Sequence, residues 1–151
     1  MKILITGAGG QDGILLIHHI LQNAPDTAIY ALSRDQKIFF SRLSAIGGDS
    51  LTNRFKEMGH FVTCDVNNRD KILSQLSLIQ PDVIFHLAAE ARIQPTLEDP
   101  ILATKTNVVG TCSVLQAARE NKVKRVVYSS TSSAYGLRNK CPLREDMPKD
   151  C

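Results

Sequence analysis

Short apolar runs alternate along the chain with longer stretches in which apolar residues recur every three or four positions. The first pattern is typical of buried strands and the second of helices with one apolar side. We expect a loop at 47–50 and little regular structure at 90–100. Strands that alternate with helices predict an α/β fold, with a doubly wound parallel sheet and helices on both faces. The strands are expected at residues 2–6, 27–32, 60–64, 83–85 and 124–129, and the helices at 14–23, 36–46, 51–58, 68–79 and 101–121.

Composition and charge argue against several classes of protein. A chain of 151 residues fits one domain with a sizeable core, so we assign residues 1–151 to a single domain. The net charge of +3 comes without a dense basic run and does not suggest nucleic acid as a partner. No apolar stretch is long enough to span a membrane, and we expect no signal peptide before Ile3. The cysteines are scattered, which favours free thiols in a reducing cytoplasm over a disulfide or metal framework: Cys64, Cys112, Cys141 and Cys151.

The first expected strand ends in a glycine-rich turn, and an apolar helical pattern follows at once. Gly7, Gly10 and Gly13 are spaced as G-x-x-G-x-x-G, with Gln11 and Asp12 between the last two. Glycine allows the positive φ of a tight turn and leaves room for a diphosphate to approach the backbone. The N-terminus of the following helix offers unpaired N–H groups and a partial positive charge. The turn is therefore a candidate dinucleotide-binding site, and a glycine-rich turn without a ligand is the alternative.

The end of the second expected strand bears on which dinucleotide binds. In doubly wound folds an acidic residue here accepts hydrogen bonds from the ribose hydroxyls, whereas an arginine accommodates a 2′-phosphate. The chain reads Ser33-Arg34-Asp35, so Arg34 offers a charged fork and Ser33 a hydroxyl. This favours NADP over NAD. Asp35 is the counter-argument, because the preference reverses if its side chain, and not that of Arg34, faces the cofactor.

Four motifs together resemble the extended short-chain dehydrogenase/reductase superfamily. They are Thr-Gly-x-x-Gly-x-x-Gly from Thr6, His-x-Ala-Ala from His86, Asn-x-x-Gly-Thr from Asn107, and the segment Ser129–Gly136. The last segment is similar to the active-site segment of nucleotide-sugar epimerases and dehydratases. The resemblance covers nearly the whole chain but only the first part of the family's length. It implies a Rossmann-like fold, NAD or NADP as cofactor, and a nucleotide-sugar substrate. His86 directly leaves a strand, so we interpret it as a packed histidine and not as a catalyst.

The resemblance also implies roles for individual residues. Asp65 would meet the adenine amino group and the backbone of Val66 would line the adenine pocket, although Asp65 can equally cap the next helix. Asn107 would support the active-site backbone, or else be a solvated or back-bonded mid-helix residue. Arg92 and Gln94 would contact the diphosphate and the sugar of the substrate, unless they belong to a plain surface loop. The rest of the cofactor would lie against four further residues: Leu87, Ala88, Ala89 and Ser129.

Thr131 falls on the catalytic serine or threonine of the resembling enzymes. A hydroxyl there can donate to the sugar oxygen during hydride transfer, and a plain strand-end threonine is the alternative. The sugar dehydratases of the family resemble one another in carrying acidic residues directly after it, where this chain has Ser132 and Ser133. This favours an epimerase that acts by transient oxidation of the sugar, or a simple reductase. The sequence of residues 10–13 is instead similar to that of the GDP-mannose dehydratases, which also favour NADP. We give Ser132 and Ser133 more weight than this similarity.

The family's general acid/base is a tyrosine in Tyr-x-x-x-Lys. None of Tyr30, Tyr128 and Tyr135 has a lysine four positions later. We therefore expect this chain to be the cofactor-binding part of the enzyme, truncated before that helix and before the substrate-binding domain, and inactive alone. A lost acid/base costs roughly 10²–10⁴ in rate. The helix at 101–121 should expose one apolar side and support a homodimer. Rival hypotheses are a stand-alone NADP-binding regulatory module and a complete reductase with another proton donor.

Overall fold

Five parallel strands form the centre of the structure, a computed structural model that describes residues 1–149. The fourth cysteine of the sequence, Cys151, lies outside the described residues. The strands lie in the order β3-β2-β1-β4-β5. Each predicted strand is confirmed, with its ends within one residue of the expected limits: β1 (Lys2–Thr6), β2 (Ala28–Ser33), β3 (Gly59–Thr63), β4 (Val83–His86) and β5 (Arg125–Tyr128).

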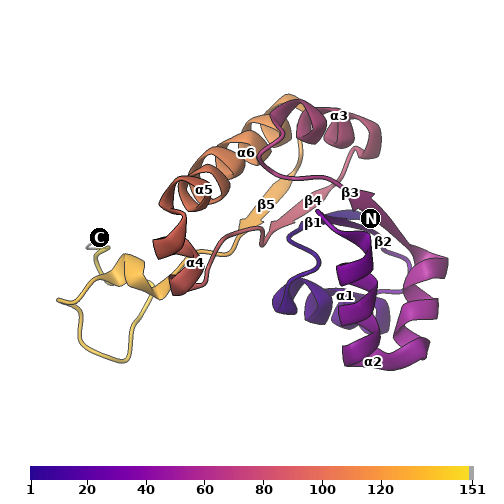
Figure 1. Cartoon of the computed structure of the whole chain (residues 1–151), viewed down its shortest axis with the longest axis horizontal. Helices are drawn as coiled ribbons and strands as arrows, with labels where there is room; N and C mark the ends of the chain where they lie inside the picture. The colour runs from indigo at the N-terminus through magenta and orange to yellow at the C-terminus, as the bar shows by residue number, and fades with distance from the viewer. Residues whose placement is uncertain (150–151) are drawn as a thin grey trace.

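Helices cover both faces of the sheet, as predicted. Helices α1 (Gln11–Asn23) and α2 (Gln36–Met58) lie on one face, and α3 (Arg69–Ile79) and α6 (Thr111–Glu120) lie on the other (Figure 1). The chain changes direction across the sheet after β3, so the topological switch point lies between β1 and β4. In folds of this kind the ligand lies outside the carboxyl ends of the strands at that point. The architecture is therefore Rossmann-like.

The core consists of two apolar clusters separated by the sheet. Successive residues of a strand point to opposite faces, so β1 contributes to both clusters and is buried on both sides. The cluster under α1 and α2 includes Ile3, Ile5, Ile14, Ile17, Ile29 and Phe39. The cluster under α3 and α6 includes Leu4, Leu32, Ile72, Leu76, Ile84 and Val114.

The expected loop at 47–50 is absent as a separate element. Helix α2 runs from Gln36 to Met58 and has a single non-helical residue, Gly48, with φ 63° and ψ −162°. That backbone conformation is open to glycine and costly for other residues, so one glycine bends the chain without a loop. The prediction of two helical segments was correct, but the extent of the break was wrong.

The segment between β4 and β5 is more regular than expected at its start and less regular later. Residues 93–98 form α4 (Ile93–Glu98), where the sequence predicted an irregular stretch. The predicted single helix at 101–121 consists of α5 (Pro100–Thr104), a π-helical turn (Lys105–Gly110) and α6. Asp99 begins α5 because its carboxylate accepts the N–H of Leu102 at 2.9 Å, and Pro100 follows at the first helical position.

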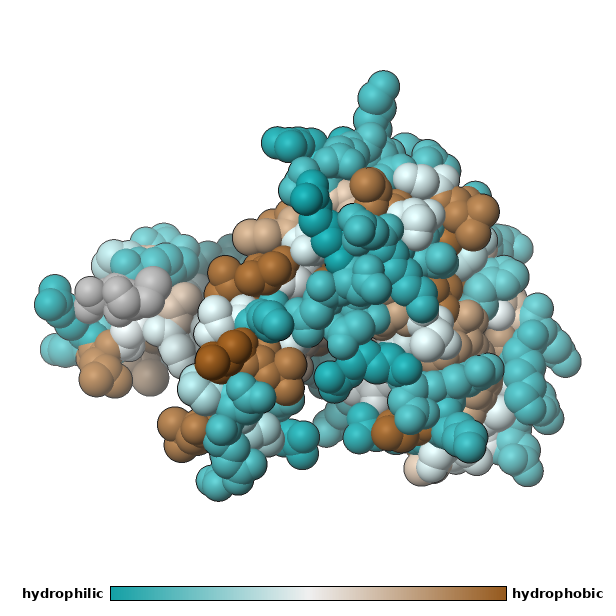
Figure 2. Space-filling view, turned by 45° about the horizontal axis from the view of Figure 1, so that its top comes forward, coloured by the Kyte–Doolittle hydropathy of each residue, from teal (hydrophilic) through white to brown (hydrophobic). Residues whose placement is uncertain are grey.

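One side of this helical stretch carries exposed apolar side chains, as predicted. Figure 2 shows apolar side chains gathered over α4 and α5. Within residues 1–149 no helix is long and apolar enough to cross a membrane. Beyond β5 the chain forms a short 3₁₀ turn (Ser132–Tyr135) and a lobe that extends away from the sheet (Figure 1). The exposed apolar residues of the stretch are Ile93, Leu97, Ile101, Leu102, Val108, Val109 and Leu115.

Candidate functional site

The three glycines of the first motif each meet a spatial constraint. Gly7 has φ +68°, and a Cβ on it would lie 2.6 Å from the backbone nitrogen of Ala88. The turn after β1 therefore packs backbone to backbone against the segment after β4. The N–H of Gly10 donates to the carbonyl of Gly7 at 2.9 Å and closes the turn. A Cβ on Gly13 would lie 2.7 Å from the carbonyl oxygen of Ala8, so α1 approaches its own strand closely.

The first turn of α1 begins at this loop and is open to solvent. Gly10 is the N-cap and supplies no side-chain hydrogen bond. Gln11 and Asp12 are both exposed in that turn. The first N–H groups of a helix lack partners within the helix, so this N-terminus can accept an anion from outside. The predicted residues of the motif thus lie together at the carboxyl end of β1.

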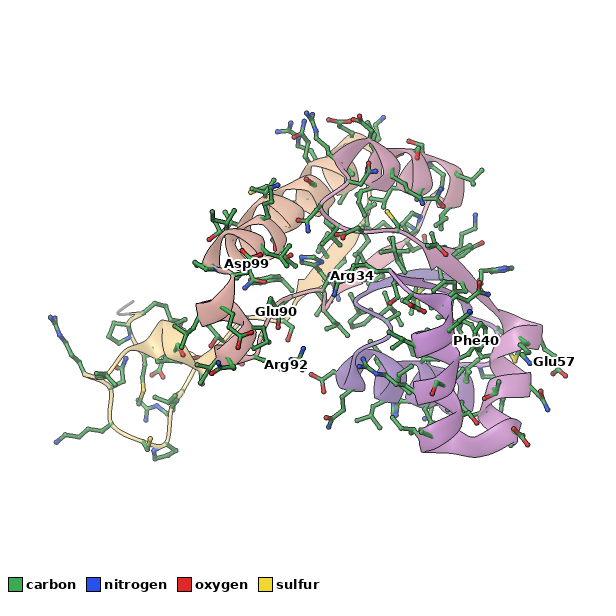
Figure 3. All side chains as sticks on the ribbon, in the orientation of Figure 1. Arg34, Phe40, Glu57, Glu90, Arg92 and Asp99 are labelled. Atoms are coloured by element: carbon green, nitrogen blue, oxygen red, sulfur yellow. The ribbon has the colours of Figure 1, made fainter. Side chains whose placement is uncertain are left out.

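Asp35, just after the carboxyl end of β2, caps a helix. Its carboxylate accepts the N–H of Ile38 at 2.9 Å and caps α2. Ser33 is the last residue of β2, and Arg34 follows it with an exposed side chain. In the view of Figure 3, Arg34 and Glu90 lie over the carboxyl end of the sheet. Asp35 therefore has a hydrogen bond within the fold, whereas the side chain of Arg34 forms neither a hydrogen bond nor an ion pair among the described residues.

The carboxyl end of β3 carries Asp65 and Val66. Asp65 accepts the N–H of Asn67 at 2.9 Å, which forms a local turn. The cap of α3 is Asn68, whose side chain accepts the N–H of Lys71 at 3.0 Å, so the capping role considered for Asp65 was wrong. Val66 is buried, and its side chain would lie 2.8 Å from a Cβ on residue 110, which must be glycine for the helix to approach.

His86, at the end of β4, is buried and joined to hydroxyl groups on both sides. The hydroxyl of Thr111 donates to the carbonyl of Asn107 at 2.7 Å. A hydroxyl has one hydrogen, so Thr111 accepts from Nε2 of His86 at 3.0 Å. Burial favours the neutral ring, in which Nδ1 accepts from the hydroxyl of Thr6 at 2.7 Å. Thr6 in turn accepts the N–H of Ala88 at 3.3 Å.

Burial lowers the pKa of His86 below its ordinary value of 6.5. The neutral ring is the form that this hydrogen-bond chain requires. The expectation that His86 is a packed histidine is confirmed, since it is 1% exposed. It links β1, β4 and α6 directly beneath the segment that follows β4.

Asn107 holds the other end of that segment. Its side-chain oxygen accepts the N–H of Glu90 at 2.8 Å, and its amide nitrogen donates to the carbonyl of Glu90 at 2.9 Å. The N–H of Leu87 donates to the carbonyl of Thr6 at 3.2 Å. The backbone of Leu87, Ala88 and Ala89 is thus fixed at both ends. Asn107 acts on this backbone, and the solvated mid-helix alternative for it was wrong.

The fifth strand brings Ser129 and Thr131 toward the same edge of the sheet. The N–H of Ser129 donates to the carbonyl of His86 at 3.2 Å and continues the pairing of β4 with β5. Thr131 is exposed, and its hydroxyl oxygen accepts the N–H of Ser133 at 3.2 Å as the cap of the 3₁₀ turn. That hydroxyl retains its own hydrogen for donation to another group.

Arg92 and Gln94 each have a partner on their own segment. The guanidinium of Arg92 lies 3.8 Å from the carboxylate of Glu90, and Gln94 donates to Glu98 at 2.7 Å within α4. Both are exposed (Figure 3 labels Arg92). The structure places them on the segment after β4, where each contacts a residue of its own segment.

A family model described as GDP-mannose 4,6 dehydratase matches residues 4–150 of the chain. The chain belongs to the GDP-mannose 4,6 dehydratase family. It is thereby a member of the nucleotide-sugar epimerases and dehydratases of the short-chain dehydrogenase/reductase superfamily, and it corresponds to the N-terminal part of that family. The family resemblance expected from the motifs is confirmed.

The relatives of this chain include epimerases and dehydratases. The UDP-glucose 4-epimerase of Mycolicibacterium smegmatis is 32% identical over 149 residues, which cover 98% of this chain and 44% of the relative. The dTDP-glucose 4,6-dehydratase of Salmonella typhimurium is 34% identical over 120 residues, which cover 80% of this chain and 31% of the relative. The chain spans less than half the length of these relatives.

A solved structure supports the fold of this family member. The UDP-glucose-4-epimerase from Stenotrophomonas maltophila, with bound NAD and a formylated UDP-arabinopyranose, matches with a TM-score of 0.80 at 21% identity. The match covers 99% of this chain and 43% of that one. At this identity the likeness establishes the Rossmann-like fold alone.

Two further residues of the family member belong to the site and were missed from the sequence. The guanidinium of Arg42, on α2, donates through Nη1 to the carbonyl of Gly9 at 2.6 Å. A Cβ on Gly9 would lie 2.8 Å from the hydroxyl oxygen of Ser33. Gly9 falls between the glycines of the G-x-x-G-x-x-G pattern, and Arg42 lies in no motif, so no sequence signal marks their contact.

Proposed function

We propose that this chain is the NAD(P)-binding part of a nucleotide-sugar epimerase that acts by transient oxidation of the sugar. The observation that carries the proposal is the convergence of motif residues from all five strands at one edge of the sheet, beside the switch point between β1 and β4. A bound nicotinamide would supply hydride transfer, accepting a hydride from a sugar carbon and returning it to the other face. The chain's own residues bind and orient the two reactants.

The residues at this edge fit a dinucleotide. The glycine turn after β1 leaves the backbone bare where a diphosphate would approach, because side chains on Gly7 or Gly13 would collide with neighbouring backbone. Asp65 and Val66, which follow β3, are proposed to contact the adenine. The segment from Leu87 to Ala89 is fixed by Thr6 and Asn107 and would support the ribose and nicotinamide.

We propose NADP, with NAD as the second choice. Several solved relatives are described with NAD, including those from Stenotrophomonas maltophila and Brucella ovis. The preference for this chain rests on its own residues: Arg34 is exposed beside Ser33, and Asp35 is committed to capping α2. An arginine at this place suits a 2′-phosphate, whereas the acid that would accept the ribose hydroxyls is turned to the helix.

Thr131 is proposed as the residue that donates a hydrogen bond to the sugar oxygen. Its hydroxyl accepts from a backbone N–H and still has a hydrogen to donate. Ser132 and Ser133 follow it, and neither can serve as the carboxylic acid that eliminates water. The epimerase proposal therefore stands ahead of a 4,6-dehydratase or a reductase. Arg92 and Gln94 are proposed as substrate contacts at the border of the site.

The chain is expected to bind the cofactor weakly and to be inactive alone. None of Tyr30, Tyr128 and Tyr135 has a lysine four positions later, and Lys149 packs on the ring of Tyr135 at 4.1 Å instead. The test is a fluorescence titration of the chain with NADPH and NADH, followed by incubation with UDP-glucose and either oxidised dinucleotide. Weak binding without epimerisation supports the proposal. Epimerisation by this chain would refute the expected inactivity. Failure to bind either dinucleotide would refute the proposal. Tight NADPH-selective binding would favour the regulatory module.

We also propose a homodimer through the helical stretch at 101–121. Ile101, Val108 and Leu115 are 73%, 56% and 46% exposed along it. Contiguous exposed apolar surface of this kind marks an interaction site. Sedimentation velocity should show a dimer that Leu115→Glu dissociates, while Leu78→Glu, at a 76% exposed position on α3, leaves it intact. A monomer at all concentrations would contradict the proposal.

A cytoplasmic location is proposed on the state of the cysteines. The three described cysteines, Cys64, Cys112 and Cys141, are free thiols. Free thiols persist where glutathione and thioredoxin keep them reduced. Labelling of intact cells with a membrane-impermeant thiol reagent should leave Cys112 and Cys141 unmodified, and labelling before lysis would contradict the proposal.

A further inference from the structure

Arg42 is the one side chain of α2 that reaches the glycine-rich turn through a hydrogen bond among the described residues. It lies on the second turn of the helix, and its Nη1 donates to the carbonyl of Gly9 at 2.6 Å. Holding a long exposed side chain in one position costs conformational entropy. A charged hydrogen bond to a carbonyl offsets that cost and fixes the guanidinium beside the turn.

A hydroxyl lies at the same place, and a second arginine follows it in the chain. Gly9 approaches Ser33 so closely that a Cβ on it would lie 2.8 Å from the serine oxygen. Arg34 follows Ser33 in the chain. Arg42 is therefore linked through Gly9 to the end of β2, where the sequence placed the residues that distinguish the two dinucleotides.

No carboxylate of the described residues forms an ion pair with either guanidinium. Within residues 1–149 neither Arg34 nor Arg42 forms an ion pair, and Asp35 is occupied by the N–H of Ile38. Two arginines and a hydroxyl without an acidic partner suit a ligand with several negatively charged oxygens. A phosphate monoester on a ribose has that chemistry, and a ribose with free hydroxyls does not.

We infer that Arg42 is a specificity-determining residue that recognises the 2′-phosphate of NADP together with Ser33 and Arg34. The inference rests on the proposed function, in which the dinucleotide binds at this edge. A guanidinium has five N–H donors, and the bond to Gly9 uses one of them. The anchored position means that little further ordering is needed when the phosphate binds, so the discrimination is built in before the ligand arrives.

The test measures the ratio of NADPH to NADH affinity by fluorescence titration of the whole chain. Arg42→Met should weaken NADPH by roughly tenfold or more, because a charged hydrogen bond to phosphate is lost. NADH affinity should change less than about twofold, since it lacks that phosphate. Arg42→Lys keeps the charge but not the fork, so an intermediate ratio is expected. Arg54→Met removes the same charge from the far half of α2, where the side chain is also exposed, and should leave both affinities unchanged.

The outcomes separate the inference from the proposed function. Equal weakening of NADPH and NADH by Arg42→Met means that Arg42 only holds the turn, which overturns the inference and leaves dinucleotide binding in place. An unmodified chain that binds the two equally overturns the inference and the proposed preference for NADP, and leaves dinucleotide binding in place. Failure to bind either one overturns both. Unfolding midpoints of all variants are measured alongside, and Arg42→Lys decides the matter if Arg42→Met does not fold.

Discussion

The hydrogen-bond chain through His86 makes a quantitative prediction for Thr111→Val. Valine has nearly the shape of threonine but no hydroxyl. The change removes the acceptor for Nε2–H of His86 and the donor to the carbonyl of Asn107. The ring is 1% exposed, so water cannot replace the lost acceptor.

A change of tautomer does not relieve the buried ring. If the proton moves to Nδ1, Thr6 must accept it at the same time as it accepts the N–H of Ala88. The hydrogen of the Thr6 hydroxyl then has no acceptor in the described contacts, and Thr6 itself is fully buried. Whichever nitrogen carries the proton, one buried donor is left unpaired. An unpaired buried donor costs about 1–3 kcal/mol.

Urea unfolding at pH 7.5, followed by circular dichroism, measures this cost. We expect Thr111→Val to lower the free energy of unfolding by about 2 kcal/mol, which moves the midpoint by about 1 M urea. Thr111→Ser is the matched control, because it keeps the hydroxyl and loses one methyl group, worth about 0.8 kcal/mol. If the valine variant is as stable as the serine variant, the assigned direction of hydrogen bonds through His86 is wrong.

Two further predictions concern the same junction of β1 and β4. Burial lowers the pKa of His86, so the unfolded chain binds a proton on this residue at a higher pH than the folded chain does. The contribution of His86 to the free energy of unfolding should therefore be constant above pH 6.5 and fall as the pH drops below 6.5. NMR titration of the His86 ring protons checks this, and an inflection at or above pH 6.5 would contradict it. Gly7→Ala should destabilise the chain by more than about 2 kcal/mol, because it combines a positive φ with a collision against backbone. Gly48→Ala shares the positive φ but meets nothing within 4 Å, so it isolates the conformational part, and equal losses from the two variants in thermal unfolding would refute the collision argument.

The strands could be predicted closely because their signal is local. β1 is a short β-branched run buried on both faces, and its apolar pattern ends where glycines begin. Parallel strands place their carboxyl ends at one edge, so the convergence of motif residues followed from topology alone. The same reasoning correctly anticipated that His86 is packed, since it directly leaves β4.

The contacts that order the site could not be predicted, because they join residues far apart in the sequence. Arg42 and Gly9 are separated by 33 positions, and Thr6 and His86 by 80. The roles of short polar residues were also interchangeable on sequence grounds. Asp35 and Asn68 both proved to be helix caps, whereas Asp65, which was equally suited to that role, forms a local turn instead.

The π-helical turn at 105–110 shows why the apolar pattern of 101–121 predicted one uninterrupted helix. A π turn adds one residue to an otherwise continuous helix, which the period of the pattern hardly registers. Its effect is on the polar residues. Asn107 makes two hydrogen bonds to the backbone of Glu90, and Thr111 bonds back to Asn107 while accepting from His86. Such turns are rare and concentrate at functional sites. Here the distortion lets one helix hold both the segment after β4 and the buried histidine beneath it, so that the proposed cofactor-binding surface is fixed by hydrogen bonds in residues 1–149.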